Sequence, residues 1–309
     1  TNTNRSMTLG SSGGTISVPA SKSLQISGQV TGSGSLTKTG AGTLTLASAN
    51  NFSGGIFISE GKVFLPSDTA NVSGLGSGLV TLNGGTLSMG DNIDTSSWAT
   101  SAWSIHVPTG SAGRLNSDGR CNLTGALTGG GDFTFYTSYV RTELLGNWSA
   151  FTGRIFVIAD SDGGDFRFQS SAGYPSARLD LGTEVSAYYN KSMTGNLTIP
   201  IGTLTGAATA WLGGGLTAGR TVIYQVGNRN EDGDYAGGLG NGTGPVALTK
   251  VGTGTLTLSG ACTHTGTTTV SAGRLRVTGT SSASAFNVQG GGTLGGTGTI
   301  TGDVTLQAN

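Results

Sequence analysis

Short runs of alternating apolar and polar residues recur along the chain. In "GTLTL", which occurs at residues 42–46 and again at residues 254–258, both leucines fall on one side of an extended chain and both threonines on the other. This period of two predicts a β-strand with one buried face. Runs of the same kind, bounded by Gly, Asn, Ser or Asp, lie at residues 14–18, 23–27, 79–82, 132–136, 154–158, 196–200, 221–226, 274–277 and 303–306.

A thirty-residue passage occurs twice, at residues 36–65 and 248–277. Its two copies keep the spacing of the glycines and the apolar alternation, which indicates a repeat of architecture. The identical positions are Leu36/Leu248, Thr37/Thr249, Lys38/Lys250, Gly40/Gly252, Gly42/Gly254, Thr43–Leu46/Thr255–Leu258, Ala49/Ala261, Gly54/Gly266, Ser59/Ser271 and Gly61/Gly273. A partial third copy, "FTGRIFV" from Phe151, aligns with "FSGGIFI" from Phe52 and "HTGTTTV" from His264.

Short strands with frequent turns and no helical crossover exclude an α/β fold and leave a sandwich, a propeller or a solenoid. The repeats favour a coil of stacked turns, so the sequence predicts an all-β parallel β-solenoid with roughly 20 to 25 residues per coil. We expect one continuous domain in three sections. Residues 1–90 and 242–309 would form its N- and C-terminal coils, and residues 91–241 an irregular middle section with longer loops.

The second copy is similar to a known repeat. "LTKVGTGTLTLSGACTHTGTTTVSAGRL" at residues 248–275 resembles the autotransporter-associated β-strand repeat, also called the passenger-associated transport repeat, of very large secreted bacterial proteins. Residues 36–63 resemble it with a degraded second half. Cys262 stands where the pattern usually has Asn, and His264 where it usually has Tyr. The resemblance implies a right-handed parallel β-helix. It also implies an extracellular location, on a bacterial cell surface.

Composition narrows the range of partners. The 309 residues include 57 Gly and carry 16 basic against 16 acidic groups, so bulk charge gives no reason to expect nucleic acid as a partner. No apolar run approaches the roughly 18 residues of a membrane-spanning helix, and none is expected. The first ten residues lack the features of a signal peptide, and we expect any export signal to be removed or to lie outside this sequence.

Candidate chemistry is sparse, and we expect no catalytic residue, no cofactor and no metal site. The acidic runs "DSDGGD", with Asp160, Asp162 and Asp165, and "NRNEDGDYAGG", with Glu231, Asp232 and Asp234, are interpreted as polar turns, with a calcium loop as the open alternative. The two histidines, His106 and His264, are the candidate histidine bases. His264 occupies a position that phenylalanine fills in the other copies, which indicates a packing role. Cys121 and Cys262 are expected to be unpaired.

Three functions remain. A structural, surface-exposed solenoid is the leading hypothesis, and the chain is not expected to be an enzyme, because its carboxylates are scattered through turns whereas glycosidases need a close pair. The second hypothesis is an adhesin that binds surface glycans through aromatic side chains. The candidates are Trp98, Trp103, Trp148, Trp211, Tyr136, Tyr139, Tyr188 and Tyr189. A polysaccharide-active enzyme is the third.

The ends of the sequence suggest a partner of a different kind. Strand candidates begin within about ten residues of Thr1, and the last one stops shortly before Asn309, without a polar or helical cap at either end. Because a bare strand edge recruits another chain, we expect copies of the chain to join head to tail into a filament. The open alternative is that the sequence is a segment of a longer polypeptide, whose ends are joined covalently to further coils.

Overall fold

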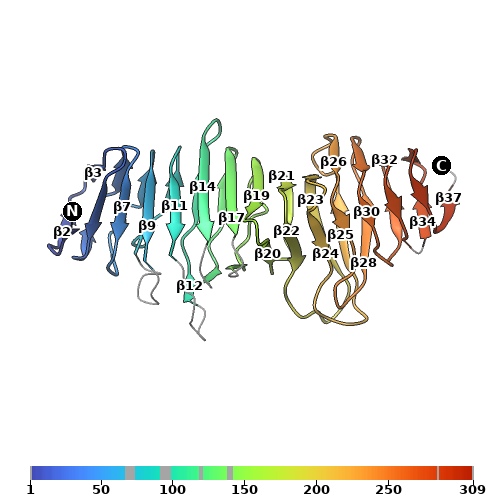
Figure 1. Ribbon diagram of the computed structural model, residues 1–309, viewed down its shortest axis with the longest axis horizontal. Helices are drawn as coiled ribbons and strands as arrows, with labels where there is room; N and C mark the ends of the chain where they lie inside the picture. Colours follow the sequence, from blue (N-terminus) through green and yellow to red (C-terminus); the bar gives the residue numbers. More distant parts are fainter. Residues whose placement is uncertain are drawn as a thin grey trace. The chain divides into compact units, whose positions relative to one another are not determined.

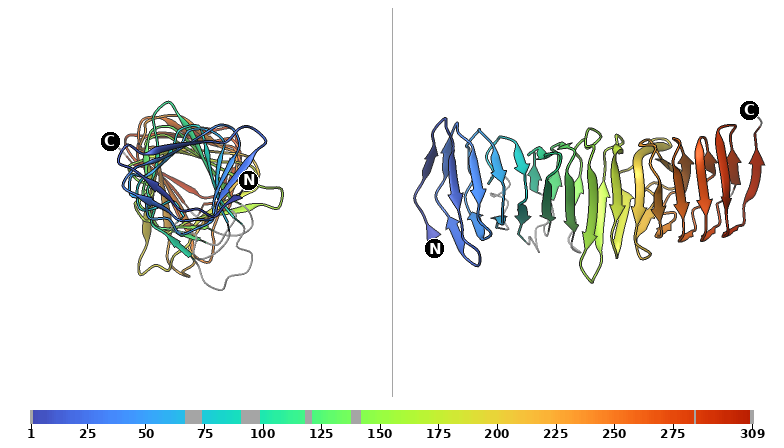
Figure 2. Two further views of the ribbon diagram at one scale, coloured as in Figure 1. Left: turned by 90° about the vertical axis from the view of Figure 1, so that its left-hand side faces the viewer. Right: turned by 90° about the horizontal axis from the view of Figure 1, so that it is seen from above.

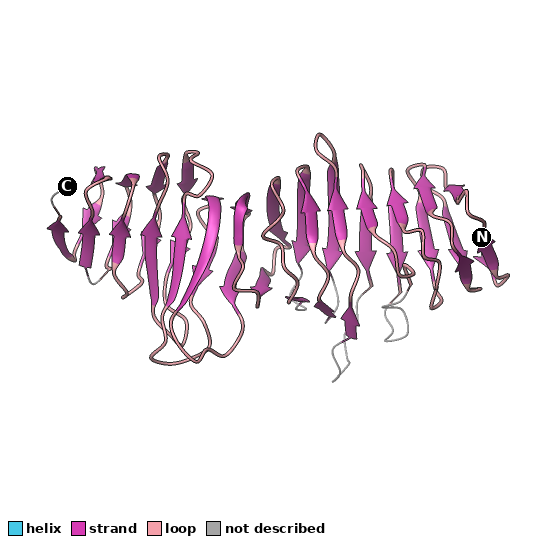
Figure 3. Cartoon of the chain, turned by 180° about the vertical axis from the view of Figure 1, so that it is seen from behind, coloured by secondary structure: helices cyan, strands magenta, loops and turns pink. Residues whose placement is uncertain are grey.

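The computed structural model describes residues 2–66, 74–90, 99–117, 121–137, 142–283 and 285–307. These residues form strands joined by turns, and they contain no helix (Figure 3). Contacts divide the chain into two compact units, Thr1–Asn147 and Trp148–Asn309. Each unit is a parallel β-solenoid (Figure 1), which confirms the predicted fold class. No helix long and apolar enough to cross a membrane occurs within the described ranges.

The strands of the first unit stack in columns, so that each strand pairs with its counterpart in the coils before and after it. One column contains β1 (Asn2–Thr3), β4 (Ser23–Ile26), β7 (Thr43–Leu46), β9 (Lys62–Leu65), β11 (Thr86–Met89), β14 (Ala112–Ser117) and β17 (Asp132–Thr137). Another contains β3 (Gly14–Ser17), β6 (Leu36–Thr39), β8 (Ile56–Ile58), β10 (Val80–Leu82), β13 (Ile105–Val107) and β16 (Leu127–Gly129). Shorter columns are β12 (Ala99–Ser101), β15 (Cys121–Leu123) and β18 (Thr142–Leu144), and β2 (Met7–Leu9) with β5 (Val30–Gly32).

The second unit is built in the same way, and Figure 2 shows the strands of successive coils side by side. A column of long strands, β19 (Arg154–Ala159), β21 (Tyr174–Leu181) and β23 (Leu197–Gly206), divides at β23 into two. One branch contains β25 (Val222–Val226), β28 (Val246–Lys250), β31 (Thr268–Val270), β34 (Ala285–Val288) and β37 (Asp303–Leu306). The other contains β26 (Gly233–Tyr235), β29 (Thr255–Leu258), β32 (Gly273–Val277) and β35 (Gly292–Gly296).

The second unit has one further column of strands. It contains β20 (Gly164–Phe168), β22 (Val185–Tyr189), β24 (Trp211–Gly213), β27 (Gly238–Leu239), β30 (Ala261–Cys262), β33 (Thr280–Ser281) and β36 (Thr299–Ile300). Long connections follow β22 and β24 and project from one side of the coils (Figure 1).

Each thirty-residue repeat forms two consecutive coils. In the first copy β6 pairs with β8, with Leu36 opposite Ile56, and β7 pairs with β9. In the second copy β28 pairs with β31, with Leu248 opposite Thr268, and β29 pairs with β32. Partners are therefore about 20 positions apart, at the lower end of the expected coil length. Between β19 and β28 the partners are about 24 or 25 positions apart, as for Ile155 and Leu179, so these coils have longer connections.

The solenoid core follows from the strand alternation. Leu44, Leu46, Leu256 and Leu258 are all buried, whereas Thr43, at the alternate position, is half-buried. Parallel pairing in register places apolar residues of successive coils above one another. Leu44, for example, lies between Leu24 and Val63. Burial of each such side chain contributes about 1.5 to 3 kcal/mol. The predicted inward face is confirmed.

Candidate functional site

Each repeat contains a lysine whose side chain is buried in the solenoid. Lys38 lies on β6 with an inward-facing position, two residues after the buried Leu36. Its Nζ donates hydrogen bonds to the carbonyl oxygens of Thr39 at 2.8 Å, Gly40 at 2.6 Å and Glu60 at 3.1 Å. Glu60 belongs to the following coil, so the ammonium group joins two coils.

The second repeat reproduces this contact. The Nζ atom of Lys250, at the end of β28, donates to the carbonyl oxygens of Val251 at 2.6 Å, Gly252 at 2.9 Å and Ala272 at 3.2 Å. Burial lowers the pKa of both lysines, and the nearby carboxylates of Glu60 and Asp232 oppose that shift. Three main-chain oxygens around each charge replace the water that burial removes.

The shared glycine two positions after the lysine shapes this corner. The φ angles of Gly40 and Gly252 are 72° and 70°, in the left-handed region that side chains rarely adopt. At Gly252 a Cβ atom would also lie 2.0 Å from the carbonyl oxygen of Gly227. The corner therefore requires glycine, and the "K-x-G" agreement between the copies encodes a buried hydrogen-bonding site. Sequence reasoning missed this role, although the lysine is identical in both copies and stands at an inward-facing strand position.

The three aligned ring positions are equivalent in burial. Phe52, Phe151 and His264 are each fully buried, which confirms that His264 is a packing residue. Its Nε2 atom lies 2.8 Å from the hydroxyl of Thr268, and Thr268 stands where the first repeat has Ile56. A polar pair thus replaces an apolar pair at one place in the core. Burial lowers the pKa of His264 to about 4.

The first acidic run folds into a turn. The carboxylate of Asp160 accepts a hydrogen bond from the main-chain N–H of Asp162 at 3.0 Å, a local turn contact. Asp165 lies on β20 and forms an ion pair with Arg167 at 2.6 Å. The carboxylates of Asp160 and Asp165 are therefore engaged by residues two positions away in the sequence.

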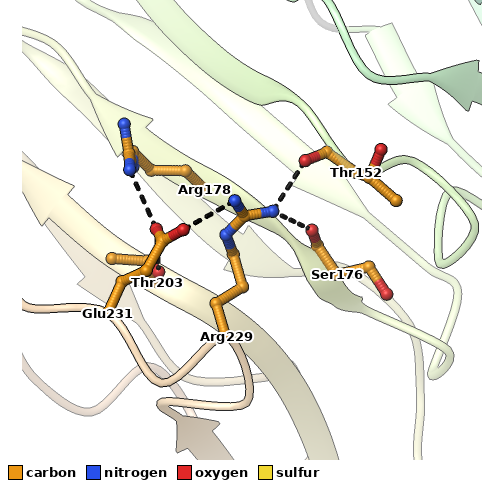
Figure 4. A network of polar contacts seen from close by, with 6 residues as sticks. All are labelled: Thr152, Ser176, Arg178, Thr203, Arg229 and Glu231. Atoms are coloured by element: carbon orange, nitrogen blue, oxygen red, sulfur yellow. Dashed lines mark hydrogen bonds and ion pairs between the residues drawn. The ribbon is translucent and has the colours of Figure 1, made fainter. Parts of the chain in front are cut away.

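The second acidic run supplies a network that connects several coils (Figure 4). The carboxylate of Glu231 forms ion pairs with Arg229 at 2.7 Å and with Arg178 at 2.8 Å, and it accepts a hydrogen bond from the hydroxyl of Thr203 at 3.1 Å. The hydrogen bond from Arg229 is the main reason that the pKa of Glu231 falls to about 2.

Arg229 extends the same network to the preceding coils. Its Nη1 atom donates to the carbonyl oxygens of Thr152 and Ser176, both at 2.6 Å. The other acids of the run also bind neighbouring coils, since Asp232 accepts from the N–H of Thr255 at 2.7 Å and Asp234 from the hydroxyl of Ser259 at 2.8 Å. Within the described part of the chain, no three His, Cys, Asp or Glu side chains gather as metal ligands would.

The remaining candidates are His106 and the two cysteines. The Nδ1 atom of His106, on β13, lies 3.0 Å from the hydroxyl of Thr128 in the next coil. Cys121 and Cys262 are buried free thiols, and burial raises the pKa of both.

The aromatic candidates fall into two groups. Trp103, Trp148 and Tyr189 are buried and contribute to packing, as in the edge-to-face contact of Trp148 with Tyr174. Tyr136 lies on the outer side of β17 under the guanidinium of Arg114. Trp211 and Tyr188, by contrast, line an open hollow of about 360 Å³ together with Asp165. Trp98 and Tyr139 lie outside the described residues.

Comparison with known proteins agrees with the geometry of the repeats. The family model of the passenger-associated-transport-repeat matches residues 36–63 and 248–277. These are the segments that form the paired coils with a buried lysine. No curated protein and no solved structure matches the chain.

Proposed function

We propose that the chain is a structural part of a secreted bacterial protein, a β-solenoid scaffold that stands outside the cell. The observation that carries this proposal is the coincidence of the matched repeats with paired coils, each fixed by a buried lysine. Proteins with passenger-associated-transport repeats are secreted, and a solenoid buries a continuous core while presenting long outer faces. Such a scaffold supplies stiffness and resistance to proteases rather than chemistry.

The polar groups support a role without catalysis. Glycoside hydrolysis requires two carboxylates on either side of one sugar bond. One carboxylate, that of Asp165, lines the hollow beside Trp211, and it is already engaged by Arg167 and by the hydroxyl of Tyr188. Glu231 is fixed between two arginines, which suits a structural ion network better than proton transfer at neutral pH.

The location can be tested on intact cells. Antibodies raised against the purified chain are applied to the bacterium that encodes it, before and after lysis, with an antibody to a cytosolic protein as the control. We expect the antibody to label intact cells or to detect the protein in the culture fluid. Detection only after lysis would overturn the proposal.

End-to-end assembly stays a prediction. What favours it is the exposed face of β37, where Val304 and Leu306 have 49% and 75% of their surface exposed. A further strand could cover these side chains, supplied either by another copy or by more of the same polypeptide. Sedimentation velocity over a range of concentrations tests this, with Val304→Lys/Leu306→Lys as the comparison. Assembly that the double variant abolishes supports the filament, and a monomer at every concentration excludes it.

A further inference from the structure

The ring of Trp211 packs against glycine residues on the outer face of the second unit. It faces outward from β24 and lies opposite Gly238 of β27. A Cβ atom at Gly213, Gly238 or Gly240 would lie 2.6, 2.6 or 2.1 Å from atoms of its ring. The indole therefore packs directly against the main chain of the sheet, and a side chain at any of these three glycines would displace it. The ring is half-buried.

Polar side chains border this ring in register. Asp165 of β20 is opposite Ser186 of β22, and Ser186 is opposite Trp211, so the three form one outward row across three strands. Arg167 and Tyr188 form the adjacent row. A carboxylate, a hydroxyl and an indole are thus presented side by side.

Asp165 and Tyr188 are held in place before any ligand arrives. The hydroxyl of Tyr188 donates to Asp165 Oδ2 at 3.1 Å, and Arg167 donates to the same oxygen at 2.6 Å through Nη2. The Arg167 guanidinium also lies over the Tyr188 ring, 5.2 Å from its centre. A prearranged site loses less entropy on binding than a mobile one.

The hollow has the size and composition of a small-ligand site. Its volume is about 360 Å³, and its remaining walls are Gly213 at the end of β24 and the loop residues 214–216 and 242–243. Small-molecule sites occupy roughly 300 to 1,000 Å³ and combine an apolar surface with a few fixed polar groups. Here the apolar surface is a flat aromatic ring, which can stack against the C–H face of a pyranose while the rim groups bond its hydroxyls.

The charges of the lining select among glycans. Asp165 is the one charged residue among the residues that line the hollow, and its charge is paired with that of Arg167. A uronate or sulfate group would therefore find no cationic side chain among the lining residues, whereas a neutral sugar would find oxygens that accept and hydroxyls that donate hydrogen bonds. We infer that this hollow, built on Trp211 with Asp165, Ser186 and Tyr188 at its rim, binds a neutral hexose-containing glycan. Glycan binding would be a function of the outer surface, separate from the structural role proposed for the coils.

The first test uses a glycan array with neutral and acidic glycans. Wild-type chain is expected to bind neutral glycans, and Trp211→Ala is expected to weaken the binding at least about tenfold, whereas Trp211→Tyr retains part of it. Phe57→Ala is the matched control, because Phe57 is an exposed ring on β8 in the other unit. It should bind as wild type does.

A second measurement covers the case in which Trp211→Ala fails to fold. The wild-type chain is labelled with 5-fluorotryptophan, and the Trp211 signal is assigned by its loss in Trp211→Tyr. Titration with the neutral glycan that binds best on the array should shift this signal and leave that of buried Trp148 in place. Absence of neutral-glycan binding, binding of acidic glycans alone, or an unshifted Trp211 signal would overturn the inference.

Discussion

The ammonium group of Lys250 and the carbonyl oxygen of Gly252 lie 2.9 Å apart, at a corner that the positive φ angle of Gly252 creates. Lys38 and Gly40 form the same pair at 2.6 Å in the first repeat. Each lysine also bonds a carbonyl of the next coil. The repeat therefore specifies a place where a buried charge joins consecutive coils.

Replacement of Lys250 with Met tests this role. The apolar side chain retains the volume but leaves three part-buried carbonyl oxygens without their donor, and an acceptor that is fully buried and unpaired costs about 1 to 3 kcal/mol. Relief of the buried charge offsets part of that cost, so we expect the free energy of unfolding to fall by about 2 to 3 kcal/mol. Urea denaturation measures it. Lys22→Met, at an exposed lysine, is the control, and an equal effect of both changes would contradict the role.

The inward and outward faces of β29 should respond differently to truncation. Leu256→Ala removes a buried side chain and should lower the free energy of unfolding by about 2 to 5 kcal/mol. Thr255→Ala, on the half-buried face, should cost well under that. The two variants can be compared by urea denaturation, and equal losses would contradict the assignment of faces.

His264 makes stability depend on pH in a defined window. Its pKa falls from 6.5 in the unfolded chain to about 4 in the fold, so the unfolded chain binds the proton more readily. The contribution of neutral His264 is complete above pH 6.5 and is lost as the pH falls toward 4, a loss of about 3 kcal/mol. Denaturation between these pH values measures it, with His264→Phe/Thr268→Ile, which restores the residues of the first repeat, as the comparison. An equally steep loss in the double variant would exclude His264 as the cause.

The Glu231 network should contribute modestly to stability. The side chain is about one third exposed, so Glu231→Gln is expected to cost about 1 kcal/mol. Because the pKa of Glu231 is depressed to about 2, its contribution is present above the usual pKa of 4.5 and disappears as the pH falls from there toward 2. Raising the salt concentration should reduce the difference between wild type and variant in thermal denaturation. A difference that is independent of both pH and salt would argue against an ion network.

Sequence patterns were sufficient for the fold because the core depends on local alternation. The "GTLTL" strands, the aligned rings at Phe52, Phe151 and His264, and the coil length of the repeats all follow from residue order. What could not be predicted depends on which coils lie next to one another. Arg229 reaches Thr152, and Trp211 packs over Gly238 and Gly240, through stacking that no local pattern reveals. The buried lysines fall between these cases, since their pattern is local but their partners lie on the next coil.

The proposed extracellular scaffold would have to withstand proteases, and digestion of the folded chain measures this property most directly. The purified chain is treated with proteinase K under native conditions, and the fragments are identified by mass spectrometry alongside those of the chain unfolded in urea. We predict that cleavage is confined to the connections between strands and that the coils of residues 248–277 persist long after the unfolded chain has been degraded. Rapid cleavage within β28, β29, β31 and β32, at the rate seen for the unfolded chain, would contradict a structural scaffold.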